Sequence, residues 1–199
     1  MKQSSLLLVL LFSSSMAYAQ GSTCISAGLA IPKQPSAFST YWKTGFSMSV
    51  GVDIPFADWL ALSAAFDFNS FLLNEERFLE GQGIAGTGLS VSGGSSSVFT
   101  LLAGAKVRVV HAPKLFSAYV TGQVGYLNFS TGDIVISADS SAGTLVGGER
   151  SSFCTSAGGG VEVPLNQVTD VFIEGRYVVD FKEKRTAFIP IRLGLRIRL

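Results

Sequence analysis

Acids and bases recur at two-residue intervals within otherwise apolar segments of this 199-residue chain, and they are its best candidates for chemistry. Side chains two positions apart share one face of a β-strand, so acids and bases from different strands can meet on one side of a sheet. An unpaired buried charge is very costly, so we expect an ion-pair network if that side is enclosed. The predicted network comprises Asp53, Asp67, Lys106, Arg108, Glu162, Glu174, Arg176, Asp180, Arg192, Arg196 and Arg198.

A catalytic role for these or other residues is not expected. Hydrolytic or acyl-transfer enzymes built on small membrane barrels generally need a histidine near the outer rim as the base. The one histidine, His111, stands beside Ala112 and Pro113 in an expected periplasmic turn. The serines have no base in a predictable position. We therefore predict that the protein is not an enzyme.

Cofactor and metal chemistry find little support in the sequence. Cys24 is expected near the periplasmic end of the first strand and Cys154 near the outer end of the sixth, too far apart for the roughly 4.4–6.8 Å Cα separation of a disulfide. Histidine, cysteine and carboxylate spacing suggests no metal site. A phosphate cradle is not expected at Gly81, Gly83, Gly86 and Gly88, because no helix follows them. We predict no cofactor.

The first residues have the pattern of an export signal. Lys2 is followed by an apolar run over 6–12 and by Ala17-Tyr18-Ala19, a small-x-small cleavage site. We expect a signal peptide at 1–19 and a mature domain at 20–199. Removing Lys2 leaves 15 − 1 = 14 basic residues against 14 acidic residues. A neutral domain gives no support for a nucleic-acid partner, which requires a basic surface.

Apolar and polar residues alternate along most of the mature chain. In segment 44–54, Phe46, Met48 and Val50 share one face, and Ser47 and Ser49 share the other. Mean hydropathy is high, at +0.40, yet the mature chain has no long unbroken apolar stretch. These features predict an all-β fold, an eight-stranded antiparallel up-and-down transmembrane β-barrel with its apolar faces in lipid. The strands are predicted at 23–32, 44–54, 59–71, 97–110, 116–130, 151–164, 170–181 and 187–199.

The connections between these strands alternate in length. Three tight connections are expected at the periplasmic end, at 55–58, 112–115 and 165–169. The other four are expected at the outer end: three long ones at 33–43, 72–96 and 131–150, and a short one at 182–186. Within the third long loop, apolar residues 134–136 can also extend the preceding hairpin. Aromatic girdles are predicted from Phe56, Trp59 and Phe116 at the periplasmic rim and from Tyr41, Trp42, Phe71, Phe99, Phe129, Phe153 and Phe181 at the outer rim.

The end of the chain resembles the β-signal read by the outer-membrane assembly machinery. Arg192, Gly194, Ile197 and Leu199 fit polar-x-Gly-x-x-apolar-x-apolar, with leucine where phenylalanine is commoner. The resemblance implies the insertion machinery as a partner. The mature chain also resembles the family of small outer-membrane β-barrel domains of the OmpA and OmpX type. The features that carry this second resemblance are the signal peptide, Gly28 to Pro32, Phe38-x-x-Tyr41, Val52-Asp53-Ile54-Pro55 and the closing strand.

Function is expected to reside in the outer loops. A filled lumen and a lipid-covered wall leave loops 72–96 and 131–150 to contact an extracellular ligand. We expect a monomeric protein of the bacterial outer membrane, surrounded by outer-membrane lipid, with a structural, adhesive or recognition role. Two alternatives remain open from sequence: a narrow channel or transport accessory, and a soluble lipocalin-like periplasmic binder of a small apolar ligand.

Overall fold

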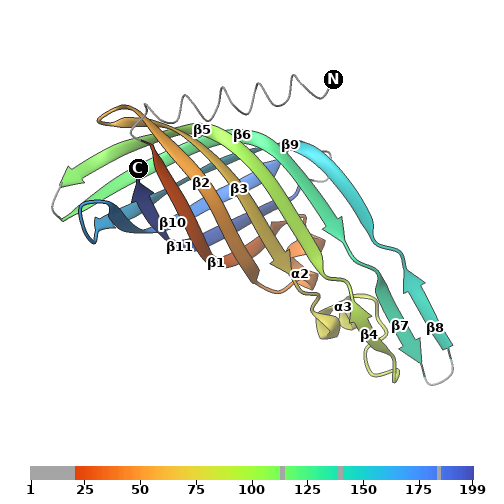
Figure 1. The fold of residues 1–199 in the computed structure, drawn as a ribbon. Coiled ribbons are helices and arrows are strands. Elements are labelled where there is room, and N and C mark those ends of the chain that lie inside the picture. The colour runs from red at the N-terminus through yellow and green to blue at the C-terminus, as the bar shows by residue number, and fades with distance from the viewer. Residues whose placement is uncertain (1–20, 113–114, 139–140, 183–184) are drawn as a thin grey trace, which may run out of the picture.

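A computed structural model describes residues 21–112, 115–138, 141–182 and 185–199, and the expected signal peptide lies outside these ranges. Eight long antiparallel strands close into a barrel in the order β1-β11-β10-β9-β6-β5-β3-β2, and β1 pairs with both β2 and β11 (Figure 1). The predicted fold class is confirmed. The strands are β1 (Ser22–Gln34), β2 (Gly45–Ala57), β3 (Leu60–Phe71), β5 (Ser96–Ala112), β6 (Phe116–Thr131), β9 (Gly148–Pro164), β10 (Thr169–Asp180) and β11 (Ala187–Arg198).

Side-chain alternation sets the inner and outer faces of the wall. On β2, Met48 and Val50 are 44% and 51% exposed on the outer surface, whereas Ser47 and Ser49 are buried in the lumen. The outer surface is therefore apolar and the lumen contains the polar residues. A one-residue shift in pairing would reverse both faces, so the alternation fixes the register.

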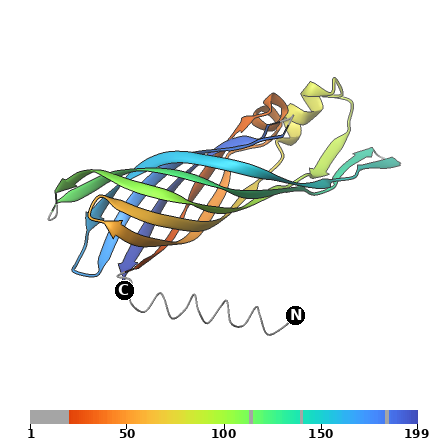
Figure 2. The same cartoon turned by 90° about the horizontal axis from the view of Figure 1, so that it is seen from above.

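The connections divide the barrel into two different ends. The tight turns and the C-terminus lie at one end, and at the other lie α2 (Ser36–Tyr41), α3 (Glu75–Gly81), β4 (Ser90–Gly93), β7 (Ile134–Ala138) and β8 (Ser141–Leu145) (Figures 1 and 2). Outer-membrane barrels turn their short connections to the periplasm, so the second end is the outer one. Among the described residues, neither helix is long and apolar enough to cross a membrane.

The outer connections fold into a cap. Strands β4, β7 and β8 form a separate antiparallel sheet, in which β7 continues the line of β6 away from the barrel (Figure 2). Apolar residues 134–136 thus extend the hairpin, one of the two interpretations that the sequence allowed. The cap has its own buried cluster of Leu73, Phe78, Val91 and Ile134. Trp42 fastens the cap by donating from Nε1 to the Gly94 carbonyl oxygen at 3.0 Å.

The predicted outer aromatic girdle is partly wrong. Phe99, Phe153 and Phe181 do face outward. Phe71, however, is fully buried and lies edge-on to Phe38, with ring centroids 4.9 Å apart. Tyr41, Trp42 and Phe129 also pack against the two apolar clusters instead of forming a lipid-facing ring. Nearness to the rim does not decide which face a side chain occupies.

Candidate functional site

The outer half of the lumen is filled with apolar side chains. Phe71 from the end of β3 meets Phe188 from the start of β11, with ring centroids 5.9 Å apart. Phe38 of α2 covers them from above, inside the same cluster. Such packing excludes water from this part of the lumen. The cluster consists of Ala30, Phe38, Phe71, Val98, Leu102, Leu127, Cys154, Val178 and Phe188.

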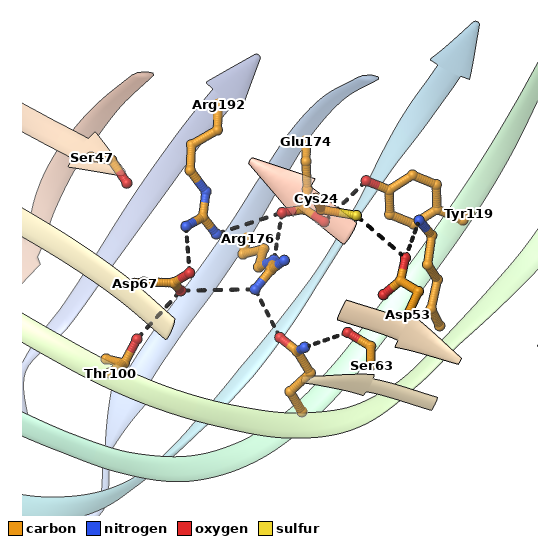
Figure 3. Close-up of polar contacts among 12 residues, drawn as sticks. Cys24, Ser47, Asp53, Ser63, Asp67, Thr100, Tyr119, Glu174, Arg176 and Arg192 are labelled. Atoms are coloured by element: carbon orange, nitrogen blue, oxygen red, sulfur yellow. Dashed lines mark hydrogen bonds and ion pairs between the residues drawn. The ribbon is translucent and has the colours of Figure 1, made fainter. Parts of the chain in front are cut away.

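Below the apolar half lies a central charged cluster of Asp67, Glu174, Arg176 and Arg192 (Figure 3). Arg192 Nη1 lies 2.7 Å from Asp67 Oδ1, and Arg176 Nε lies 2.6 Å from Glu174 Oε1. The strand register places Glu174 directly opposite Arg192 on β10 and β11. All four residues are buried, so two acids and two bases compensate one another.

Neutral polar residues complete this central cluster. Gln123 accepts a bond from Arg176 Nη1 at 2.9 Å and donates to Ser63 Oγ at 2.8 Å. Tyr119 donates to Glu174 Oε2 at 3.0 Å (Figure 3). Sequence reasoning missed both residues because it searched only for charges. Their two-residue spacing through Thr121 on β6 was the signal that could have found them.

A second charged cluster lies nearer the periplasm and contains Asp53, Lys106, Glu162 and Arg196. Asp53 Oδ2 lies 3.2 Å from Lys106 Nζ and 2.7 Å from Arg196 Nη2. Glu162 pairs with the same two bases. Lys106 Nζ also lies 3.7 Å from the centre of the Tyr119 ring, which links this cluster to the central one. Here too, two acids face two bases.

Asp180 stands apart at the outer end. Its Oδ2 atom lies 3.4 Å from Arg150 Nη2, and its Oδ1 atom accepts a bond from the backbone N–H of Thr186 at 2.8 Å. Arg150 was absent from the predicted network because it was assigned to an outer loop, whereas β9 already begins at Gly148.

The structure does not bring Arg108 and Arg198 into the lumen clusters. Arg108 donates to the Asp58 carbonyl oxygen at 3.0 Å. Arg198 Nη2 lies 2.5 Å from Asp170 Oδ1, and half of the Arg198 side chain is exposed. Both residues lie at the periplasmic rim, where they line the same cavity as Asp53 and Arg196, at the edge of the periplasmic cluster. Alternation gives the face of a strand correctly but not the height along the barrel at which a side chain lies.

The space left inside the charged half is small. One cavity beside Cys24, Thr121 and Phe172 has a volume of about 20 Å³, and one between Asp53 and Arg196 has about 50 Å³. Such volumes hold one to a few water molecules. A wider space of about 630 Å³ opens at the periplasmic mouth. The two cavities between the charged clusters can therefore order water but are too small for a substrate.

Other reactive groups are distributed without a common site. Cys24 and Cys154 are free thiols, and Cys24 Sγ lies 3.8 Å from Asp53 Oδ2. The backbone of His111 pairs with Ser117 at the end of β5, so it lies within the strand and not in the turn beyond it. In the described ranges, no group of three or more histidine, cysteine or carboxylate side chains is arranged to hold a metal ion.

The closing strand β11 shows where the residues of the β-signal pattern lie. Arg192 points into the lumen and Ile197 is 45% exposed on the outer wall. A Cβ on Gly194 would lie 2.5 Å from both the Ile25 carbonyl oxygen and Phe172 Cζ, so only glycine fits there without displacement. The Leu199 N–H donates to the Gly21 carbonyl oxygen at 2.8 Å, at the junction of β1 and β11.

A lipid-facing apolar wall around a polar, filled lumen defines a small membrane β-barrel. Consistently, residues 4–196 match the model of the outer membrane protein beta-barrel domain, and the chain belongs to that family. It is a protein of the bacterial outer membrane, with its wall in lipid. The soluble lipocalin-like alternative is therefore wrong.

Solved structures of small outer-membrane barrels share this fold. Neisserial surface protein A has a TM-score of 0.61 at 14% identity, covering 91% of this chain and 98% of that one. Ail, the attachment invasion locus protein of Yersinia pestis, has a TM-score of 0.53 at 13% identity, covering 91% and 99%. A major outer membrane protein from Thermus thermophilus has 0.56 at 12% identity, covering 90% and 99%. A search of curated protein sequences gives no significant match.

Proposed function

We propose that this protein is a non-enzymatic surface protein that recognises or adheres to an extracellular partner through its cap. The observation that carries the proposal is the contrast between a filled lumen and an ordered cap. Cavities of about 20 and 50 Å³ leave no room for a substrate between the charged clusters. The outer connections instead form two helices and a three-stranded sheet around their own apolar cluster. Binding residues commonly lie on loops held by such a rigid scaffold.

The charge of the cap indicates what kind of partner it fits. Loop 72–96 contains Glu75, Glu76 and Glu80 against Arg77, and the connection from β6 to the start of β9 at Gly148 contains Asp133 and Asp139 without a base. Ail of Yersinia pestis was solved in complex with the heparin analogue sucrose octasulfate. A sulfated sugar would be repelled by two acidic loops, so a neutral or basic protein surface is the partner that fits this chain.

The base of the β7-β8 hairpin adds apolar surface to this acidic cap. Leu145 and Val146 are 51% and 86% exposed. Leu145 pairs with Ile134, the first residue of β7, so the two exposed residues lie where the hairpin joins the rest of the chain and not at its turn. Exposed apolar side chains with acidic residues around them are typical of a protein interaction surface.

We also propose that the protein is a monomer that the outer-membrane insertion machinery assembles through Arg192, Gly194, Ile197 and Leu199. Gly194 has a packing role of its own, so its replacement cannot isolate the signal. Ile197→Ser changes an outward-facing side chain that is 45% exposed and makes no lumen contact. If the signal operates, this variant should slow membrane insertion in cells more than it slows refolding of the purified chain in lipid vesicles.

Shortening the cap tests the proposed recognition function. Residues 75–93 and 134–145 are each replaced by a tight turn, and the protein is displayed on a bacterial host that lacks other adhesins. We expect adherence to eukaryotic cell monolayers to be lost, while the heat-modifiable gel mobility of the folded barrel is kept. A matched control replaces the short connection 182–186 alone and should keep adherence. Adherence that survives the double replacement contradicts the proposal.

A further inference from the structure

The outer wall has a cleft at the level of the outer rim that is separate from both the lumen and the cap. It has a volume of about 320 Å³, and its lining includes Tyr126 of β6, Phe153 of β9, and Phe181 and Lys182 after β10. These strands are neighbours in the barrel (Figure 1). Phe153 and Phe181 are 74% and 64% exposed, so the cleft faces the surrounding lipid and not the interior.

The aromatic walls of the cleft are held in place by the barrel. Tyr126 and Phe153 are directly opposite on β6 and β9, with ring centroids 6.4 Å apart in an edge-to-face arrangement. Phe181 is fixed beside them because its backbone N–H donates to the Phe153 carbonyl oxygen at 3.1 Å. The cleft is thus bounded by rigid, amphipathic or apolar rings, which are suited to the junction of headgroups and acyl chains.

Below the cleft, the wall is lined by small side chains. Along β9, Thr155, Ala157 and Gly159 follow Phe153 on the outward face, and Gly159 pairs with Gly175 of β10. Together, the cleft and this trough extend about 20 Å from Phe153 to Gly159, at roughly 3.3 Å per residue. Strands in such barrels are tilted, and one leaflet of the hydrocarbon core is about 15 Å deep. The cleft and the trough together therefore have the length of one acyl chain of the outer leaflet.

The charge beside the cleft is positive. Lys182 is exposed, and the sequence of the connection 182–186 contains Lys182, Lys184 and Arg185 against one acid, Glu183. Lys182 lies at the outer rim, at the headgroup level, where a phosphate would meet it while the lipid chains descend along the wall. The acidic loop 72–96 begins on a different strand, β3, and the one exposed acid at the start of β9, Glu149, is outnumbered by the exposed bases Lys182 and Arg185.

From the cleft, the trough and the adjacent cation together, we infer that strands β6, β9 and β10 form a specific binding site for an outer-leaflet lipid whose headgroup carries an exposed phosphate. Lys182 contacts the phosphate, the three aromatic rings surround the headgroup junction, and one acyl chain lies over Ala157. A barrel with no such site would bind lipids of equal chain length without regard to headgroup.

Quenching of a tryptophan by brominated lipid measures this preference locally. The reporter protein combines Phe153→Trp with Trp59→Phe, and the control protein combines Phe66→Trp, on the lipid face of β3 across the barrel, with the same Trp59→Phe. Native Trp42, inside the cap, contributes the same background fluorescence to the reporter and to the control protein. Vesicles contain either brominated phosphatidic acid or brominated phosphatidylcholine with identical chains. We expect the reporter to prefer phosphatidic acid about fivefold, the effect of one lysine near a charged headgroup, and the Phe66→Trp control to show no preference.

Three further variants of the reporter separate a specific site from ordinary solvation by lipid. Lys182→Ala should abolish the preference, whereas Lys43→Ala should retain it because Lys43 precedes β2, on the opposite wall of the barrel. Ala157→Leu, which fills the trough without changing charge, should lower quenching by phosphatidic acid. An equal preference in the reporter and in the Phe66→Trp control, or a preference unaffected by Lys182→Ala, would overturn the inference.

Discussion

The two halves of the lumen are filled by different kinds of side chain, apolar in the outer half and charged in the periplasmic half. Inward-facing positions in the outer half contain Phe71, Leu102, Leu127 and Phe188, which exclude water by close contact. Inward-facing positions in the periplasmic half contain two charged clusters, each with two acids and two bases. We expect the apolar half to tolerate substitutions that keep the side-chain volume. We expect the charged half to tolerate only substitutions that keep the numbers of acids and bases equal. The difference teaches that a filled lumen can depend on shape in one region and on charge in the next.

The largest effect is expected from removing one charge of the central cluster. Arg192→Met keeps much of the side-chain volume but leaves Asp67 and Glu174 with only Arg176 as a base. Removing one partner of a buried ion pair typically costs about 3–5 kcal/mol. We expect a loss of this size in the free energy of unfolding, measured by urea titration of the protein in lipid vesicles.

A compensating variant checks that charge balance is the cause. Arg192→Met with Asp67→Asn leaves one acid and one base, Glu174 and Arg176, whose Oε1 and Nε atoms are 2.6 Å apart. The double variant should regain more than half of the lost stability. If it is as unstable as the single variant, packing around Arg192, and not charge, stabilises this half.

The apolar half should respond to volume instead. Leu102 is 1% exposed, and Leu102→Ala should cost about 2–5 kcal/mol because it leaves a cavity. Leu102→Met conserves volume and should cost less than about 1.5 kcal/mol. The same urea titration measures both. Similar losses for Leu102→Met and Arg192→Met would remove the distinction between the halves.

Alternation along the chain was sufficient to predict the barrel. Observed and predicted strand ends differ by at most three residues, as in β3 (Leu60–Phe71) against 59–71. Each strand must keep one face in lipid and one in the lumen, so the pattern persists over many residues. It also places Phe71, an odd-numbered neighbour of outward-facing Phe66 and Phe68, on the inward face. Assigning Phe71 to the girdle ignored this parity.

The cap and the heights of side chains could not be predicted in the same way. The cap cluster joins Leu73, Phe78 and Val91 from connection 72–96 to Ile134 from the connection after β6, and these residues share no common period. Arg108 and Arg198 have the correct face but lie at the rim, where water solvates them. The alternation of a strand can be read from its own residues. The distant segments that will cover the end of that strand cannot be.

Two arginines on one face of β11 provide a smaller test of the charged half. Arg198 pairs with Asp170 at the rim, with half of its side chain exposed. Asp170 is buried whereas Arg198 is half exposed, so Arg198→Gln should cost about 1–2 kcal/mol, more than the loss of an exposed pair and less than that of a buried one. Arg196→Gln should cost several times more, because Arg196 is buried between Asp53 and Glu162. Equal losses in urea titration would mean that Arg198 belongs to the enclosed network.

The smallest expected effect is on ion conduction. Lys106→Ala with Glu162→Ala removes one base and one acid, so the periplasmic cluster stays balanced while its space widens. Ions would still meet the apolar half, where Phe71 and Phe188 are fully buried against each other. We therefore expect this double variant, like the native protein, to show no single-channel steps in planar bilayers.

Phe71→Ala with Phe188→Ala is the matched variant of the other half, and it too should stay closed, because the ion pairs still fill the lumen below. If only the Lys106→Ala, Glu162→Ala variant shows single-channel current steps, the charged half alone blocks ions in the native barrel. Steps in the native protein would favour the narrow-channel function over recognition through the cap.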